Sequence, residues 1–127
     1  MIEFYTHLNS EDQLLLEMAE VGRFDRYKIS IYGGEGPIPH FHFDCEADNI
    51  HGCIRLDRPE YFQHGRYKDR LSTSERKRMI KWLMSPHQSF GKYGLTNWEV
   101  ICIYWNDNNR NHLTEPNLPM PNYIKLR

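Results

Sequence analysis

The segment from Pro39 to Glu46 carries several side chains that can bind a metal ion or move a proton. Alternate residues of a β-strand point to opposite faces, so an extended chain here separates its side chains by chemistry. One face carries four ionisable groups, which are His40, His42, Asp44 and Glu46. The other face is apolar and carries Phe41, Phe43 and Cys45. We therefore expect a half-buried strand with a functional site on its ionisable face.

A divalent metal ion is the first type of chemistry that this face predicts. Neutral imidazoles and carboxylates are ligands for zinc and iron, and an H-x-H pair on a strand aims both rings in the same direction. The predicted ligands are His40, His42 and Glu46, and zinc is the predicted kind of metal.

Acid–base catalysis is the second type of chemistry. Histidine titrates near neutral pH, so His40 and His42 could exchange protons with a substrate. In this interpretation Asp44 or Asp57 orients the imidazoles, and Arg55 holds a phosphate group. The chain would then be a His-dependent enzyme, such as a ribonuclease or a metal-dependent hydrolase. Clustered ionisable groups are often structural. The alternative is therefore that this face has no catalytic or binding role and is a polar sheet face that is solvated or joined by cross-strand salt bridges.

The neighbouring residues predict how this strand is held in a sheet. A strand over 27–32 precedes it, and another over 51–57 follows it. A two-residue turn at Asp48-Asn49 joins the last two strands into a hairpin that separates apolar from ionisable groups. Its predicted pairs are Phe43–Ile54, Phe41–Leu56, His42–Arg55, Asp44–Cys53, His40–Asp57 and Glu46–His51.

A helix is predicted over residues 10–22. Ser10 and Gln13 have the spacing of a capping box, and Gly22 is a typical C-terminal stop. Between them the apolar residues follow helical spacing, at Leu14, Leu15, Met18 and Val21.

Two further helices are predicted in the second half of the chain. One begins at Ser72, where Glu75 completes a capping box, and ends before Pro86. The other covers residues 97–105 after a capping box that begins at Thr96, and its apolar face carries Trp98, Ile101, Cys102 and Trp105. A strand is the rival prediction for 97–105, because several of these residues favour sheets.

Length and composition indicate a single domain over residues 1–127, with an Asn- and Pro-rich tail from about residue 106. The hydrophobic content of 39% and the aromatic content of 13% favour a globular fold over a disordered chain. Together with the predicted elements, they indicate an α+β fold, with a small antiparallel sheet of three or more strands packed by about three helices.

Charge and cysteine usage narrow the classes of partner and compartment. A net charge of −1 does not indicate a nucleic-acid or membrane partner by itself. The N-terminus lacks the basic region and apolar run of a secretory signal, and no segment reaches the length of a membrane span. The three cysteines include no C-x-x-C pair. We therefore expect a reduced, cytoplasmic protein that does not enter a membrane.

Residues 66–81 carry a local excess of positive charge. Seven of these sixteen residues are cationic, and they are Arg66, Lys68, Arg70, Arg76, Lys77, Arg78 and Lys81. The acidic residues of the segment are Asp69 and Glu75. Together with nearby aromatic residues, such a surface suits phosphate contacts and base stacking. The predicted partner-binding residues are Arg70, Lys77, Arg78 and Lys81, and the alternative is an ordinary solvated helix face.

The motif Pro39-His40-Phe41-His42, after a strand and a Gly/Pro loop, resembles the signature of a family of small uncharacterised bacterial proteins. That signature is similar to PPHFH, and this chain has Ile38 in place of the first proline. Further segments of the chain look like a Bacteroidetes-type branch of this family. They are Tyr61-Phe62-x-His64-Gly65, the helix through Trp82, and Thr96-Asn97-Trp98-Glu99 with the later Trp105-Asn106-x-Asn108-Asn109. The resemblance covers residues 27–123. It implies a compact cytoplasmic protein in which His40 and His42 matter, but it supplies no substrate.

The leading functional hypothesis from the sequence is a module that binds a protein or RNA partner without catalysing a reaction. Members of the similar family are often encoded beside another small domain, which implies a toxin–antitoxin-like or mobile-element system. The basic segment 66–81 and its aromatic neighbours would form the contact surface. The competing hypothesis is the His-dependent enzyme described above.

Overall fold

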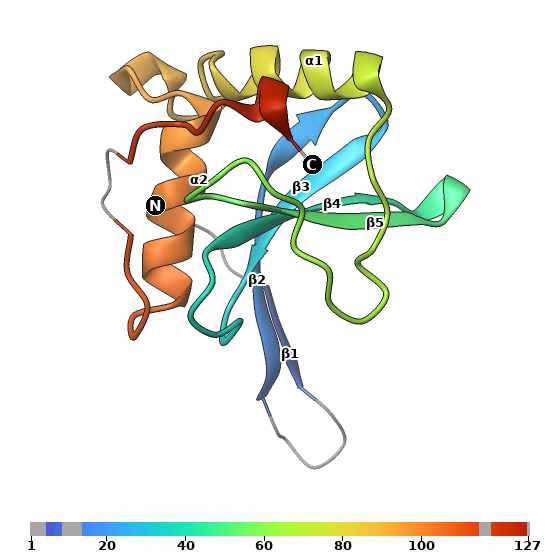
Figure 1. Cartoon of the computed structure of the whole chain (residues 1–127). Helices are drawn as coiled ribbons and strands as arrows, with labels where there is room; N and C mark the ends of the chain where they lie inside the picture. Colours follow the sequence, from blue (N-terminus) through green and yellow to red (C-terminus); the bar gives the residue numbers. More distant parts are fainter. Residues whose placement is uncertain (1–4, 9–13, 115–117, 127) are drawn as a thin grey trace.

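The computed structural model describes residues 5–8, 14–114 and 118–126 (Figure 1). One antiparallel sheet has the order β1-β2-β3-β4-β5, with strands at Tyr5–Leu8, Leu14–Phe24, Tyr27–Tyr32, His40–Cys45 and Ile50–Arg55. The α-helices are α1 at Thr73–Leu83 and α2 at Asn97–Asn108. Single 3₁₀ turns occur at Glu46–Asp48, Gly91–Tyr93 and Tyr123–Lys125. This arrangement confirms the predicted α+β class and antiparallel sheet.

The apolar core lies between the sheet and the two helices. Phe41 of β4 and Ile54 of β5 are fully buried, as are Met79 of α1 and Ile101 of α2. Helix α2 contacts β2 and β3, while α1 lies across one end of the sheet and also contacts α2 (Figure 1). No helix in the described part of the chain is both long and apolar enough to cross a membrane.

Both helix starts in the second half of the chain agree with the sequence. Ser72 and Glu75 form a complete capping box at α1, and Thr96 and Glu99 form another at α2. Residues 97–105 are therefore helical, and the rival prediction of a strand is wrong. The buried face of α2 explains the result, because Trp98, Ile101, Cys102 and Trp105 all lie in the core.

The predicted helix over residues 10–22 is wrong for its described part, because residues 14–22 belong to β2. Its expected capping residues, Ser10 and Gln13, lie outside the described residues. Strand β2 pairs with both β1 and β3, and Ala19 and Val21 are buried while Glu20 is exposed. Two neighbouring strands thus override a sequence pattern that also suits a helix. The described residues contain two α-helices rather than about three.

The predicted hairpin of β4 and β5 exists, but its register differs by two residues. The observed pairs are His40↔Arg55, Phe41↔Ile54, His42↔Cys53, Phe43↔Gly52, Asp44↔His51 and Cys45↔Ile50. The connection is longer than a two-residue turn, because Glu46–Asp48 forms a 3₁₀ turn and Asn49 takes the left-handed conformation at φ 51°. A shift of two residues leaves every side chain on its predicted face. His40 and His42 therefore still share a face with Cys53.

Candidate metal centre

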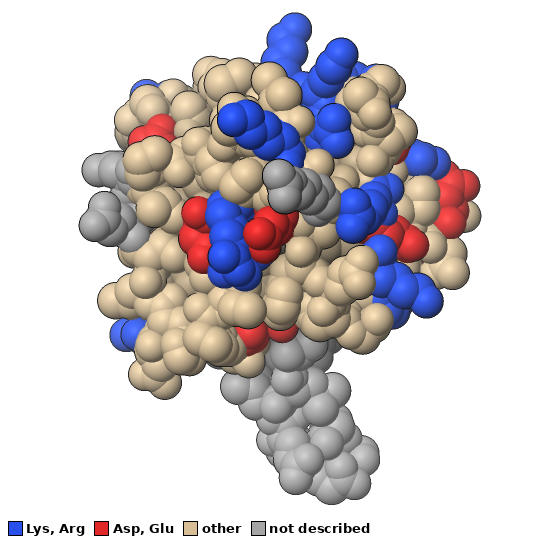
Figure 2. All heavy atoms as spheres, viewed as in Figure 1, with Lys and Arg blue, Asp and Glu red and all other residues tan. Residues whose placement is uncertain are grey.

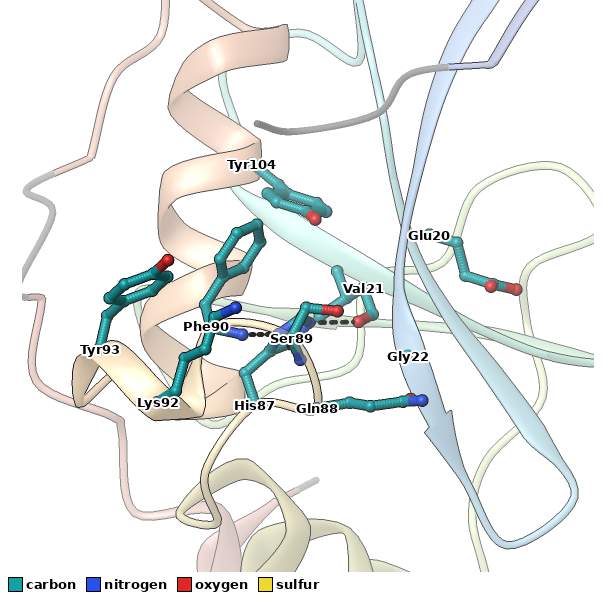
Figure 3. Close-up of a pocket in the computed structure, with 10 residues that line it drawn as sticks. All are labelled: Glu20, Val21, Gly22, His87, Gln88, Ser89, Phe90, Lys92, Tyr93 and Tyr104. Carbon is teal, nitrogen blue, oxygen red and sulfur yellow. Dashed lines mark hydrogen bonds between the residues drawn. The ribbon is translucent and has the colours of Figure 1, made fainter.

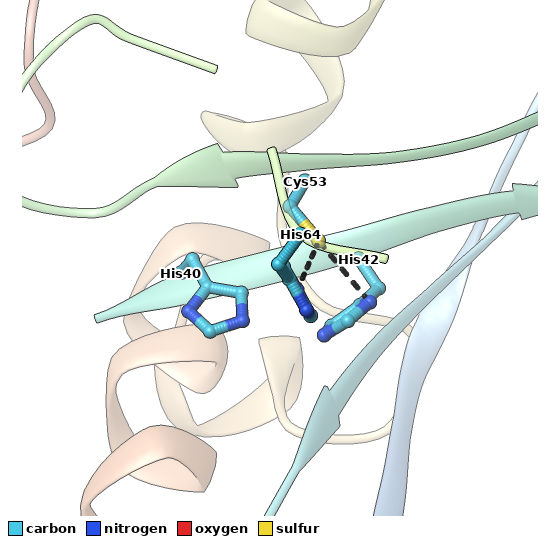
Figure 4. A group of neighbouring side chains, drawn as sticks. All are labelled: His40, His42, Cys53 and His64. Carbon is cyan, nitrogen blue, oxygen red and sulfur yellow. Dashed lines mark hydrogen bonds between the residues drawn. The ribbon is translucent and has the colours of Figure 1, made fainter. Parts of the chain in front are cut away.

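Four side chains with metal-binding atoms meet on one face of the β4–β5 hairpin (Figure 4). His40 and His42 extend from β4, Cys53 lies opposite His42 on β5, and His64 comes from the segment after β5. One ligand atom from each of the four lies within 4.8 Å of the others. The Phe62 N–H donates to the Cys53 carbonyl at 3.0 Å, which fastens the His64 segment along the edge of β5.

Hydrogen bonds fix which nitrogen of His42 carries its proton. His42 Nε2 lies 2.6 Å from Glu35 Oε1. The carboxylate can only accept, so Nε2 donates and Nδ1 keeps its lone pair. That Nδ1 lies 3.2 Å from Cys53 Sγ. A carboxylate that holds the far nitrogen of a histidine is the usual outer partner of a metal-binding imidazole.

The orientation of His40 leads to the same conclusion. Its Nδ1 donates to the Ile38 carbonyl at 2.7 Å, which leaves a lone pair on Nε2. His40 is buried, and its Nε2 has no hydrogen-bond partner. Glu35 Oε1 lies 3.5 Å from this nitrogen. A buried acceptor that faces a carboxylate is costly unless a cation lies beside it, so this ring is oriented as a metal ligand.

The distances around Cys53 are close to those of a zinc site. Zn–S and Zn–N bonds of about 2.3 and 2.0 Å at tetrahedral angles place sulfur and nitrogen about 3.5 Å apart. Cys53 Sγ lies 3.2 Å from His42 Nδ1 and 3.3 Å from His64 Nε2. Zinc would therefore require the side chains to separate by only a few tenths of an ångström. Thiolate and imidazole together are ligands that zinc prefers.

Burial sets the protonation of these groups. It lowers the pKa of both His42 and His64, so both rings are neutral at pH 7 and keep a lone pair. Burial raises the pKa of the Cys53 thiol, and the charges of Glu35 and Asp44 raise it further. The thiol therefore stays protonated until a cation displaces its proton.

The state of Glu35 has two opposing causes. Burial raises the pKa of this carboxyl, but the neighbouring imidazoles of His40 and His42 outweigh burial and lower the pKa to about 2. The hydrogen bond that His42 donates is part of this effect. Its carboxylate is therefore ionised at neutral pH and can accept the His42 proton. Gly34 and Gly36, at φ 67° and 83°, shape the tight loop that turns Glu35 back towards β4.

A pocket of about 250 Å³ reaches this cluster from outside. Its walls are Tyr32, Glu35, His42, His64 and Tyr67. The rings of Tyr67 and Tyr32 lie against His42, with centroids 4.3 and 4.6 Å away. His40 and Cys53 are not part of the lining, and His64 is the least buried of the four. The cluster is therefore a buried group with one accessible side.

A larger pocket of about 480 Å³ contains another histidine, His87, between β2 and the loop before α2 (Figure 3). His87 Nε2 donates to the Val21 carbonyl at 2.7 Å, and its Nδ1 accepts the N–H groups of Ser89 and Phe90. Both ring nitrogens are already satisfied. The His87 imidazole therefore fastens this loop to β2 and has no lone pair left for a ligand.

The structure does not bring every predicted site residue to this cluster. Glu46 lies on the exposed 3₁₀ turn, where its carboxylate is 3.9 Å from His51 Nε2, so it is not placed with His40 and His42. Asp44 is buried and pairs with His51, with Oδ1 and Nδ1 2.5 Å apart. These three residues form a second, smaller group of possible ligands.

The other predicted catalytic residues form a separate pair. Arg55 donates to Asp57 through Nε at 2.8 Å and Nη2 at 2.7 Å. Neither Asp44 nor Asp57 is hydrogen-bonded to a ring of His40 or His42 in the described structure, and Glu35 takes that role instead. The predicted polar face is not solvated, because His40, His42 and Asp44 are all buried. Its salt-bridged form occurs in part, because Asp44 and His51 are cross-strand partners and form an ion pair.

Sequence reasoning missed Glu35, Cys53 and His64 as members of this site. Glu35 lies in the Gly33-Gly34-Glu35-Gly36 loop, and a charged residue between glycines was the available signal. The two-residue error in register placed Cys53 opposite Asp44 instead of His42. His64 lies in an irregular segment, whose path no periodic pattern predicts.

The predicted partner-binding residues are exposed and lie away from the cluster. Lys77, Arg78 and Lys81 are on the exposed side of α1, and Arg70 precedes that helix. Arg78 Nε donates to Asp25 at 2.6 Å, and the Arg70 guanidinium lies over the Tyr61 ring at 4.9 Å.

Comparisons with known proteins supply no identity for this site. No family model, curated protein or solved structure matched the chain. The resemblance to the PPHFH-like family therefore stays a prediction. The functional argument rests on the geometry of the side chains.

Acid is expected to destabilise the metal-free fold through this cluster. The pKa of His42 and of His64 lies below the usual 6.5, and that of Glu35 below 4.5. The unfolded chain therefore binds more protons than the folded chain as the pH falls. The neutral imidazoles of His42 and His64 contribute stability that is present above pH 6.5 and is lost below it. The ionised Glu35 carboxylate contributes stability that is lost as the pH falls from 4.5 towards 2.

The measurement is the urea midpoint of the metal-free chain between about pH 7.5 and pH 4. We expect the midpoint to fall, and we expect His42→Gln to make the fall shallower. A midpoint that stays constant across this range would contradict the proposed protonation states.

Proposed function

We propose that the chain is a zinc-dependent hydrolase. In this proposal His40, His42 and Cys53 hold the metal, and its fourth position opens to the pocket beside His64. The observation that carries the proposal is the pair of oriented imidazoles, with the free His40 Nε2 and with His42 Nδ1 3.2 Å from a thiol.

The uneven burial of the four side chains supports a catalytic rather than a closed structural site. Catalytic zinc sites use three protein ligands and keep one position for water or substrate, whereas structural sites use four protein ligands. His40, His42 and Cys53 are almost completely buried, whereas His64 is half-buried and lines the pocket. The fourth position therefore falls where solvent and substrate can arrive.

The residues around the pocket would divide the chemical work. Zinc lowers the pKa of a bound water to about 7 and polarises a carbonyl or phosphoryl oxygen. Glu35 orients His42, while the rings of Tyr32 and Tyr67 cover that imidazole on the pocket side. His64 is neutral at pH 7, so its imidazole can take a proton from water and return it to the leaving group.

His64→Ala tests this division of roles. We expect the variant to keep one zinc per chain but to hydrolyse bis(p-nitrophenyl) phosphate at least about 100-fold more slowly than the unaltered chain, as for a lost acid–base group. His112→Ala is the matched control, because His112 is exposed and lies outside the cluster. Zinc content is measured by plasma mass spectrometry, and hydrolysis by p-nitrophenol release. Loss of zinc in His64→Ala would show a closed four-ligand site and would contradict the hydrolase proposal.

A further inference from the structure

The acidic residues of segment 66–81 are engaged in hydrogen bonds. Asp69 Oδ2 accepts the His51 N–H at 2.9 Å. Glu75 accepts the Ser72 N–H at 3.1 Å and the Tyr27 hydroxyl at 2.8 Å. Both carboxylates are thus bound to other parts of the chain. The outward charge of this segment is therefore positive.

Most cations of this segment have no anionic partner. Arg78 pairs with Asp25, and Arg66 lies 3.8 Å from the exposed Glu46. The remaining five form no salt bridge with any residue that the structure describes, and they are Lys68, Arg70, Arg76, Lys77 and Lys81. Unpaired cations that share one surface repel one another, and binding of a polyanion relieves that repulsion.

This basic strip, defined as the cationic residues of 66–81, begins at the wall of the small pocket. His64 and Tyr67 line the pocket, and the chain then runs through Lys68 and Arg70 to the start of α1. Figure 2 shows Lys and Arg side chains along the upper edge of the molecule, where Figure 1 places α1. The strip thus follows the pocket-lining Tyr67 along the chain and continues onto the exposed face of α1.

We propose that the substrate of this site is single-stranded nucleic acid, with its phosphates along the basic strip and one phosphodiester in the pocket. Regularly spaced phosphates complement a row of lysine and arginine side chains. The pocket of about 250 Å³ is far smaller than a duplex, so only one phosphodiester with its nearest atoms fits there. An aromatic ring that such a strand can stack on is present, because Tyr67 lines the pocket.

The chemical step rests on the proposed hydrolase function, whereas binding along the strip does not. The oxygen of a water molecule adds to phosphorus, and the P–O bond to one sugar breaks. The departing oxygen takes up the proton that the water loses. The products are a phosphomonoester and an alcohol, so the reaction needs no oxidant or further reactant.

The test measures binding of a fluorescein-labelled single-stranded RNA of about twelve nucleotides by fluorescence anisotropy. We expect Lys77→Glu/Lys81→Glu to raise the Kd at least about tenfold at low salt. The slope of log K against log salt is expected to become shallower by about 1.4, since two phosphate contacts are lost at about 0.7 each. The control is Lys92→Glu/Arg110→Glu, which changes the net charge equally at exposed positions outside the strip.

Two outcomes would overturn the nucleic-acid assignment. One is an equal loss of affinity in the strip variant and in the control, with unfolding curves that show both variants folded. The other is displacement of the RNA by polyglutamate as readily as by unlabelled RNA, because the strip would then be a surface for acidic proteins. Zinc-free protein separates this proposal from the hydrolase, since it should still bind RNA if the strip is correctly assigned. Loss of RNA binding in the zinc-free protein, while it remains folded, would contradict the strip.

Discussion

Replacing His42 by alanine is expected to weaken zinc binding by more than the loss of an outer hydrogen-bond partner would. His42 would supply a ligand nitrogen, and its other nitrogen is held by Glu35 at 2.6 Å. Loss of an outer hydrogen-bond partner alone typically costs about 10- to 100-fold in metal affinity. Loss of the ligand itself should therefore exceed that range. Competition with a fluorescent zinc chelator measures the difference.

Two further variants make this result interpretable. Glu35→Gln keeps a hydrogen-bonding side chain but removes the charge, so its zinc affinity should fall within the range of about 10- to 100-fold. Cys53→Ser keeps the shape of the side chain and should lose zinc as His42→Ala does. Equal zinc affinity in His42→Ala, Cys53→Ser and the unaltered chain would contradict the assigned ligands, whatever the stability of the variants.

Gly52→Ala is expected to be the most destabilising single methyl addition in the hairpin. A Cβ at Gly52 would lie 2.1 Å from Phe43 Cζ and 2.5 Å from the Asp69 carbonyl oxygen. The second contact is with backbone, so a change of side-chain rotamer cannot relieve it. Overpacking typically costs about 1–3 kcal/mol and more where the backbone must move. We expect the free energy of unfolding to fall by about 3 kcal/mol or more.

Urea denaturation measures this cost, and Gly65→Ala is the control. Gly65 has a positive φ of 56°, but open space surrounds the position of its Cβ. Its replacement should cost only the left-handed strain of about 1–2 kcal/mol. Equal destabilisation by the two substitutions would contradict the register that places Phe43 opposite Gly52.

The sequence predicted the chemistry of the hairpin faces better than its pairing. Alternation between His40, Phe41, His42 and Phe43 sets which face is apolar, and any shift by an even number of residues preserves that division. The number of residues in the connection depends on the conformation of Glu46–Asn49. Nothing in the alternation specifies that conformation, so the register was wrong by two.

The first predicted helix failed for a different physical reason. Leu14, Leu15, Met18 and Val21 satisfy helical spacing, but a strand pattern of alternate burial fits Ala19 and Val21 as well. Pairing on both edges, with β1 and with β3, decides between them. This pairing is made by the two neighbouring strands, which lie outside residues 14–22, so it leaves no trace in the periodicity of those residues. The helices with capping boxes, by contrast, carry their start signals within four residues.

The members of the metal centre could be predicted only in part. His40 and His42 lie two residues apart on one strand, so a local rule finds them. Glu35 and His64 reach the site from irregular segments whose paths depend on the rest of the fold. The Glu46 ligand was predicted because alternation was extended past Cys45, where the strand in fact ends.

The zinc content of the purified, tag-free protein tests the central claim most directly. We expect one zinc per chain, and X-ray absorption at the zinc edge should show one sulfur at about 2.3 Å with nitrogen neighbours at about 2.0 Å. Protein that is purified without zinc and then fails to take up zinc from a competing chelator would contradict the assignment of His40, His42 and Cys53 as a metal centre.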